Sequence, residues 1–127
     1  MTAPCERREL SFTVPGRCIP TPRPRVSRRG THYPKRYTDW LDSARVEAYR
    51  ACGRPLWEGP VSVTVVFCGA RANADIDNLL KSVLDAIQGV IIVDDKQADA
   101  VNAWRVSGGE PYTEITVRDF VELGGRK

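Results

Sequence analysis

The hydrophobic residues of the chain follow two different periods, and each period predicts a kind of element. Apolar and polar residues alternate around 10–14 and again around 61–67, which predicts two strands. The other face of the second segment is also apolar, so this strand is expected to be central in its sheet. Apolar residues at helical spacing predict a first helix up to Cys52 and a second helix over 76–87.

Polar and glycine residues mark where these elements begin and end. Thr38 or Asp39 can cap the first helix, and Gly53 ends it. The second helix repeats its apolar spacing without a miss, and Gly89 lies where a helix C′ glycine is expected. The first strand is predicted to end at Pro15, before a proline-rich stretch in which helix and inner strand are both unfavourable.

The C-terminal third is predicted to add three more strands. A short apolar run at 90–93 predicts a short strand. Segments around 100–106 and 112–117 flank the turn sequence Ser-Gly-Gly-Glu-Pro, which predicts a β-hairpin. The resulting fold class is α+β (mixed α/β), with helices packed on one sheet in a single domain over residues 1–127 and a frayed tail at 124–127.

Composition excludes several classes of protein. The 42% hydrophobic and 28% charged content is typical of a globular domain, and no apolar run approaches the ~18 residues of a membrane span. The first residues lack the apolar stretch of a signal peptide, so a cytoplasmic location is expected. Four irregularly spaced cysteines, without C-x-x-C, and a single histidine argue for reduced thiols and against a zinc site.

Positive charge is concentrated in one arm, residues 15–37. Between Arg17 and Arg36 there are seven basic residues and no acidic one, although the net charge of the chain is only +3. Such a block indicates an arm that binds a polyanion, or more simply a solvated basic loop. Its prolines restrict the backbone, which lowers the entropy lost on binding. The candidate DNA-binding residues are Arg23, Arg25, Arg28, Arg29, Lys35 and Arg36.

Aromatic residues at the end of this arm have two interpretations. Tyr33, Tyr37 and Trp40 could stack on unpaired bases. Trp40 also belongs to the apolar stripe of the first helix, which favours a place in the core.

Acidic residues near the second helix are the candidates for chemistry. Asp75 and Asp77 flank Ile76 at the start of that helix, and two carboxylates so close repel each other unless a divalent cation binds them. A third acid, Asp95, follows the short apolar run, and Lys81 lies one turn beyond Asp77. Asp75 and Asp77 also have a structural interpretation, because an aspartate at a helix start can cap backbone N–H groups.

Two neighbouring acids extend these alternatives. Lys81 could form a surface salt bridge between Asp77 and Asp85, and the pair Asp94-Asp95 could be a polar turn. The combination of an acidic cluster with a basic, proline-stiffened arm nevertheless favours phosphodiester cleavage, in which the arm holds the strand and a metal activates water.

The run D-I-D-N-L-L-K-x-x-L-D-A-I-x-G followed by D-D-K-Q, from Asp75 to Gln97, resembles the signature of the RusA family of Holliday junction resolvases. Upstream, the segments F-T-V-P-G, P-x-P-R-P-R and Y-P resemble phage and prophage members of that family. Cys18 departs from the proline or small residue expected there. The resemblance covers the chain from about Phe12 to the last strand.

This resemblance implies a Mg²⁺-dependent homodimer, for which Mn²⁺ could substitute, that nicks opposed strands of a four-way DNA junction symmetrically in a bacterial cell. It implies Asp75, Asp77 and Asp95 as metal ligands and Lys81 as a catalytic residue, with Asp94 and Asp85 in supporting positions. Other branched DNA, such as flaps or forks, and a non-cleaving junction-binding protein are alternatives. The last hairpin and the 90–93 run are candidate dimer surfaces.

Overall fold

A computed structural model, which describes residues 8–22, 25–28 and 30–120, contains both predicted helices and every predicted strand except the short one at 90–93. The fold class is α+β, as predicted. The predicted frayed tail lies outside the described residues. The elements in chain order are β1 (Glu9–Pro15), β2 (Arg25–Ser27), β3 (Gly30–His32), α1 (Lys35–Cys52), β4 (Val61–Cys68), α2 (Ile76–Ile87), the 3-10 helix η1 (Asp95–Gln97), β5 (Ala98–Val106) and β6 (Tyr112–Asp119).

β4 is one of the two inner strands of the main sheet, beside β6. The strand order is β1-β6-β4-β5, so β4 has a neighbour on each side. It runs antiparallel to β6, with Val63 opposite Val117, and parallel to β5, with Val63 opposite Val101. A parallel pair needs a crossover connection, and α2 provides it between β4 and β5. The prediction of a central strand at 61–68 is confirmed.

The two C-terminal strands are both present, but the predicted hairpin between them is wrong. β5 and β6 lie on opposite sides of β4 and do not pair with each other. The turn at 107–111 passes over the end of β4, where the Cys68 thiol donates to the Gly108 carbonyl at 3.1 Å. Because both faces of β4 carry apolar residues, pairing on both edges buries this strand more completely than a hairpin order would.

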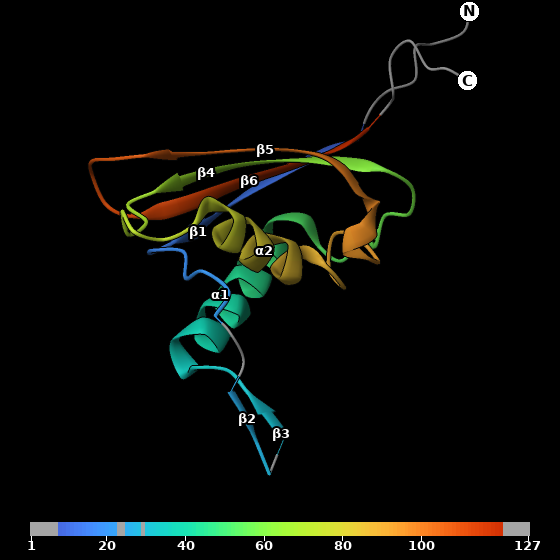
Figure 1. The fold of residues 1–127 in the computed structure, drawn as a ribbon. Helices are drawn as coiled ribbons and strands as arrows, with labels where there is room; N and C mark the ends of the chain where they lie inside the picture. The colour runs from blue at the N-terminus through green and yellow to red at the C-terminus, as the bar shows by residue number, and fades with distance from the viewer. Residues whose placement is uncertain (1–7, 23–24, 29, 121–127) are drawn as a thin grey trace, which may run out of the picture.

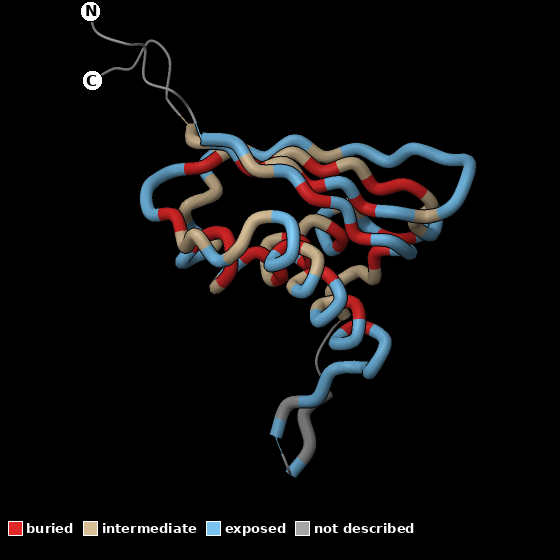
Figure 2. Tube along the Cα trace, turned by 180° about the vertical axis from the view of Figure 1, so that it is seen from behind, coloured by how far each residue is buried: buried red, intermediate tan, exposed pale blue. Residues whose placement is uncertain are grey.

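Both helices cover the same face of the sheet (Figure 1). The residues of α2 that face it are Leu79, Val83, Ala86 and Ile87, all fully buried. The buried segments gather between the helices and the sheet, as Figure 2 shows from behind. No helix in the described part of the chain is long and apolar enough to cross a membrane.

Two boundaries differ from the prediction. α1 begins at Lys35 after Pro34, a turn earlier than the predicted caps, because the ring of Tyr37 is buried and extends the apolar stripe. The 90–93 run forms turns with isolated bridges instead of a strand. Val90, Ile91 and Ile92 are core residues, so this run is wrong as a dimer surface, and only Val93 is exposed.

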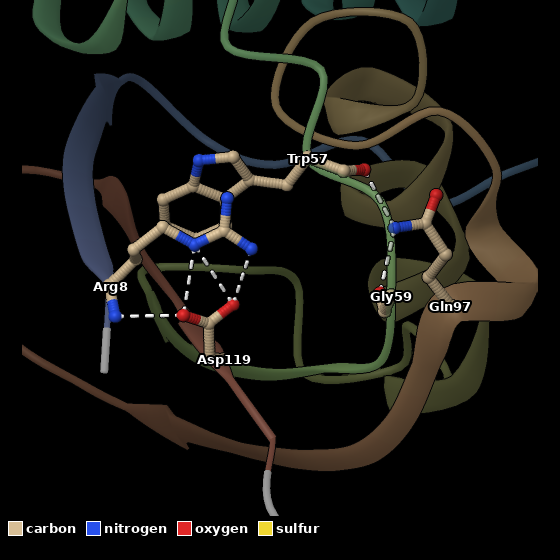
Figure 3. A network of polar contacts seen from close by, with 5 residues as sticks. All are labelled: Arg8, Trp57, Gly59, Gln97 and Asp119. Carbon is tan, nitrogen blue, oxygen red and sulfur yellow. Dashed lines mark hydrogen bonds and ion pairs between the residues drawn. The ribbon is translucent and has the colours of Figure 1, made fainter. Parts of the chain in front are cut away.

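Gln97 anchors the segment that carries Asp95. Its side-chain Nε2 donates to the carbonyls of Trp57 and Gly59, both at 2.8 Å (Figure 3). Its Oε1 accepts from the backbone N–H groups of Val93 at 3.0 Å and Asp94 at 2.9 Å. One side chain therefore joins η1 to the segment that precedes β4.

An ion pair closes the same end of the sheet. The Arg8 guanidinium donates to both carboxylate oxygens of Asp119, at 2.7 Å from Nη2 to Oδ1 and 2.9 Å from Nε to Oδ2, and lies 4.4 Å from the centre of the Trp57 ring (Figure 3). The hydrogen bonds from Arg8 lower the pKa of Asp119 below its ordinary value of 3.8. The pair joins the start of β1 to the end of β6.

Replacing Gln97 with alanine should lower the free energy of unfolding by about 2 kcal/mol, because the backbone N–H groups of Val93 and Asp94 and the carbonyls of Trp57 and Gly59 lose their hydrogen-bond partner. Gln88→Ala is the matched control, since its Oε1 accepts one bond, from the Asp95 N–H at 3.0 Å. Urea unfolding of both variants measures the difference. Equal losses in the two variants would contradict the anchoring role of Gln97.

Asp119→Asn should lower stability at neutral pH by under about 1 kcal/mol, since the pair with Arg8 is partly exposed. The folded-state pKa of Asp119 is depressed, so the wild-type advantage is complete above the unfolded pKa and declines as pH falls below about 3.8. Urea titrations from pH 7 to pH 3 measure it. Asp42→Asn, at an exposed position of α1, should show no such convergence with wild type.

Candidate active site

Asp75 and Asp77 lie together at the start of α2, where the chain returns from the end of β4. Asp75 is the N-cap residue, but its side chain makes no capping hydrogen bond, and Asp77 is in the first turn. Both residues are exposed. Neither carboxylate has a hydrogen-bond or ion-pair partner in the part of the chain that the structure describes. The capping interpretation of Asp75 is therefore not realised, and these oxygens are available to a ligand.

The loop from Gly69 to Ala74, which positions these acids, is fixed from both sides. Gly69 has φ of +78°, and a Cβ there would lie 2.9 Å from the Cβ of Pro111, so only glycine fits. Arg17 Nε donates to the Gly69 carbonyl at 3.0 Å. Arg105 Nη1 donates to the carbonyl of Ala72 at 3.2 Å. The loop is thus held by side chains that follow β1 and end β5.

The base of the proline-rich arm packs along α2. The Thr21 N–H donates to the Asn78 carbonyl at 3.0 Å, and Ser82 Oγ donates to the Ile19 carbonyl at 2.6 Å. The hydroxyls of Thr21 and Ser82 are 3.0 Å apart. The segment therefore forms one wall beside the acidic end of α2.

Cys18, which departs from the family pattern, is a buried residue of this wall. Burial raises the pKa of its thiol to about 12, so the thiol stays protonated and is unsuited to act as a nucleophile. Cys18, Cys52 and Cys68 are all free, which confirms the predicted reduced thiols for the described cysteines.

Lys81 lies one turn beyond Asp77 and is exposed. It forms no ion pair with any described residue, so the predicted alternative of a salt bridge to Asp77 and Asp85 is wrong. The Asp85 carboxylate instead accepts a hydrogen bond from the Tyr37 hydroxyl at 2.9 Å. Burial raises the pKa of Tyr37, and the nearby Asp85 carboxylate contributes in the same direction. Asp85 therefore joins α2 to α1.

Asp95 lies at the other end of α2. It is the first residue of η1, and its N–H donates to the side chain of Gln88, the C-cap residue of α2. The twelve residues of α2 span about 18 Å, and Figure 1 shows η1 at the far end of this helix. Among the described residues, no group of three potential ligands could hold a metal ion. One chain thus brings Asp75 and Asp77 together but not Asp95.

Asp94 has a structural role in the same turn. Its carboxylate accepts from the Lys96 N–H at 2.8 Å, and with Gln97 it forms a capping box at the start of η1. The interpretation of Asp94-Asp95 as a polar turn is therefore correct for Asp94, which shapes the segment that presents Asp95.

The basic arm includes a small β-hairpin, β2–β3, which projects away from the main sheet (Figure 1). Arg28 is exposed at its turn, and Arg25 belongs to β2. Arg23 and Arg29 lie outside the described residues. Lys35 and Arg36 are exposed in the first turn of α1, where Lys35 pairs with Asp39 at 2.8 Å.

The structure also separates the aromatic candidates. Trp40 and Tyr37 are buried at 6% and 3% exposure, so both are core residues and the base-stacking interpretation is wrong for them. Tyr33 is exposed and its ring centre lies 5.5 Å from that of Tyr37. Only Tyr33 of the three remains accessible to a base.

Two adjoining cavities border the acidic end of α2, and they include residues that the sequence did not single out. One has a volume of about 330 Å³ and is lined by Arg17, Cys18, Ile19, Pro20, Arg36, Arg71, Asn73 and Ala74. The other, of about 240 Å³, adds Asp75 and Asn78. The available signal for Arg71 was a basic residue in the loop just before the D-x-D motif.

Comparison with known proteins identifies the family of the chain. The model of the family described as endodeoxyribonuclease RusA matches residues 15–118, most of the chain. A search of the curated proteins found no matching sequence. The match spans the basic arm, both helices and the D-x-D segment with its lysine. The chain therefore belongs to the RusA family of endodeoxyribonucleases.

Proposed function

We propose that this nuclease resolves four-way DNA junctions by paired symmetric nicks, with Mg²⁺ as its cofactor, in the cytoplasm of a bacterial cell. The observation that carries the proposal is the pair of carboxylates, Asp75 and Asp77, at the start of α2, which have no partner in the described part of the chain and lie beside cavities lined by arginines. Family membership supports the class of reaction, which is cleavage within a DNA chain.

The donor set at the start of α2 fits a hard divalent cation. Carboxylate oxygens are the ligands Mg²⁺ takes in proteins, usually one or two of them with water and phosphate. Asp75 and Asp77 are exposed and have no donor partner among the described residues, so no hydrogen bond must be broken for them to bind an ion. The ion, when bound, supplies activation of water and neutralisation of charge at the scissile phosphate.

Lys81 is proposed to stabilise negative charge on the phosphate that is cut. Its ammonium group lies on the same face of α2 as Asp77, one turn further on, and no described carboxylate neutralises it. A lysine free of ion pairs can donate to a phosphate oxygen as charge accumulates there in the transition state.

The third acid, Asp95, is proposed to act in a homodimer. Within one chain the length of α2 separates Asp95 from the other two aspartates, so one ion cannot bind all three. A two-fold axis that places two α2 helices antiparallel would bring Asp95 of one copy to Asp75 and Asp77 of the other, twice. Two equivalent sites suit a junction whose two strands are cut symmetrically.

The arm is proposed to hold the DNA. The β2–β3 hairpin, which carries Arg28 at its turn, projects from the molecule (Figure 1), and Lys35 and Arg36 are exposed at the start of α1. Arg23, Arg25 and Arg29 belong to the same proposed contact surface on sequence grounds. Phosphate contacts of this kind supply most of the affinity that does not depend on base sequence.

Asp77→Asn should reduce Mg²⁺-dependent junction cleavage by more than about 100-fold, because even the outer partners of metal ligands cost 10–100-fold when removed. The assay compares a mobile four-way junction, a flap, a fork and a duplex, with Mg²⁺ and with EDTA. Asp42→Asn, at an exposed position of α1, is the matched control and should cleave normally. Full activity of Asp77→Asn would exclude it as a ligand, and preferred cleavage of flaps or forks would identify another branched substrate.

A mixture of Asp77→Asn and Asp95→Asn proteins should regain activity that neither variant has alone. Each mixed dimer contains one site with both aspartates intact and one site that lacks both, so random exchange restores roughly a quarter of the wild-type sites. The products should be single nicks, read on denaturing gels after subunit exchange. A mixture as inactive as its components would show that each site is built within one chain.

A further inference from the structure

Three arginine side chains from different segments border one cavity. Arg17, Arg36 and Arg71 line the 330 Å³ cavity, and no aspartate or glutamate lines it. None of the three forms an ion pair with a described residue. Like charges gathered around one hollow repel each other unless an anion enters between them. The cavity is therefore suited to bind an anion, whereas Asp75 and Asp77 nearby are suited to bind a cation.

Each arginine is positioned independently of the basic arm's tip. Arg17 follows β1 and uses only its Nε in the 3.0 Å bond to the Gly69 carbonyl, which leaves its terminal amino groups for a ligand. Arg71 lies in the loop whose backbone carbonyls accept hydrogen bonds from Arg105. Arg71 itself is exposed. Arg36 comes from the first turn of α1. A planar guanidinium can donate two parallel hydrogen bonds to one phosphate.

The cavity continues into the acidic end of the site. The second cavity shares Arg36, Asn73 and Ala74 with the first and reaches Asp75. The two cavities together thus bring three arginines near one of the proposed metal ligands, Asp75. The first cavity, of about 330 Å³, has room for a phosphate group.

We propose that this arginine pocket, formed by Arg17, Arg36 and Arg71, binds a backbone phosphate next to the scissile one on the same DNA strand. The proposal rests on the proposed function, because it takes Asp75 as part of the site that cuts. Binding the neighbouring phosphate positions the strand along the groove and sets which phosphodiester reaches the acids. These arginines are positioning residues, and they act on the ground state as well as on the transition state.

The test pairs Arg71→Gln with junctions that carry one uncharged methylphosphonate linkage, placed in turn at each of the two positions on either side of the cut. For wild type, one of these linkages should weaken binding and single-turnover cleavage by about tenfold, the scale of one charge-assisted hydrogen bond. Arg71→Gln should show the same loss on unmodified DNA. Arg71→Gln combined with that linkage should show no further loss of binding or cleavage, because both changes remove the same contact.

Matched variants separate this contact from general charge loss. Arg50→Gln removes the same charge from an exposed site on α1, and its effect should be small and additive with every linkage. Arg28→Gln, on the arm, should reduce the magnitude of the negative slope of log K against log salt by about 0.9 without coupling to any of the four linkages. Arg36→Gln should couple to the same linkage as Arg71→Gln. Melting temperatures close to that of wild type would confirm that each variant is folded.

Binding is measured in EDTA as well as in Mg²⁺. If wild type cuts no junction, the four linkages are placed at the phosphates around the branch point, so the pocket is tested in either case. If wild type cuts no junction but Arg71→Gln still couples to one linkage in EDTA, the proposed function would be wrong and the arginine pocket would be supported. Additive effects of Arg71→Gln and Arg36→Gln at all four linkages would overturn the proposal. Competition by inorganic phosphate without that coupling would assign the pocket to free phosphate, which also overturns it.

Discussion

Burial of the apolar face of α2 against the sheet is the constraint on which the rest of the site depends. Leu79, Val83 and Ile87 are fully buried, so the helix cannot rotate about its axis without exposing them. Asp77 and Lys81 consequently stay on the exposed side. The same helix accepts the proline-rich segment through Asn78 and Ser82, so one packing arrangement positions the acids, the lysine and a wall of the groove together.

Among the described residues, ion pairs join strands of the sheet, whereas the acids and Lys81 of the proposed metal site form none. Arg8 with Asp119 and Arg118 with Glu9 join β1 to β6. In contrast, Asp75 and Arg36 border the same cavity without forming an ion pair. Unpaired charges of both signs contribute little to stability, and they remain available to a ligand that carries phosphate and a cation together. Arginine and aspartate thus form ion pairs in the sheet, whereas at the proposed site they do not pair with each other.

The length of α2 sets a second condition on function. Asp95 is held firmly, by the Gln97 and Asp94 contacts of η1, but at the wrong end of the helix for a site within one chain. If Asp95 belongs to the proposed metal site, a second molecule has to supply Asp75 and Asp77. The proposed two-fold dimer would do so and would make cleavage depend on assembly, which suits the proposed symmetric cutting of two strands.

The sequence by itself determined the central strand at 61–68, the apolar face of α2, the glycine end of that helix and the closeness of Asp75 to Asp77, because periodicity and short spacings report local geometry. Tertiary structure alone decided that β5 and β6 flank β4, that Asp95 is a helix length from the other acids, and that Arg17, Arg36 and Arg71 share a cavity. Strand order and the meeting of distant loops are set by long-range pairing and burial. Residues separated by tens of positions leave no periodic trace of that meeting in the chain.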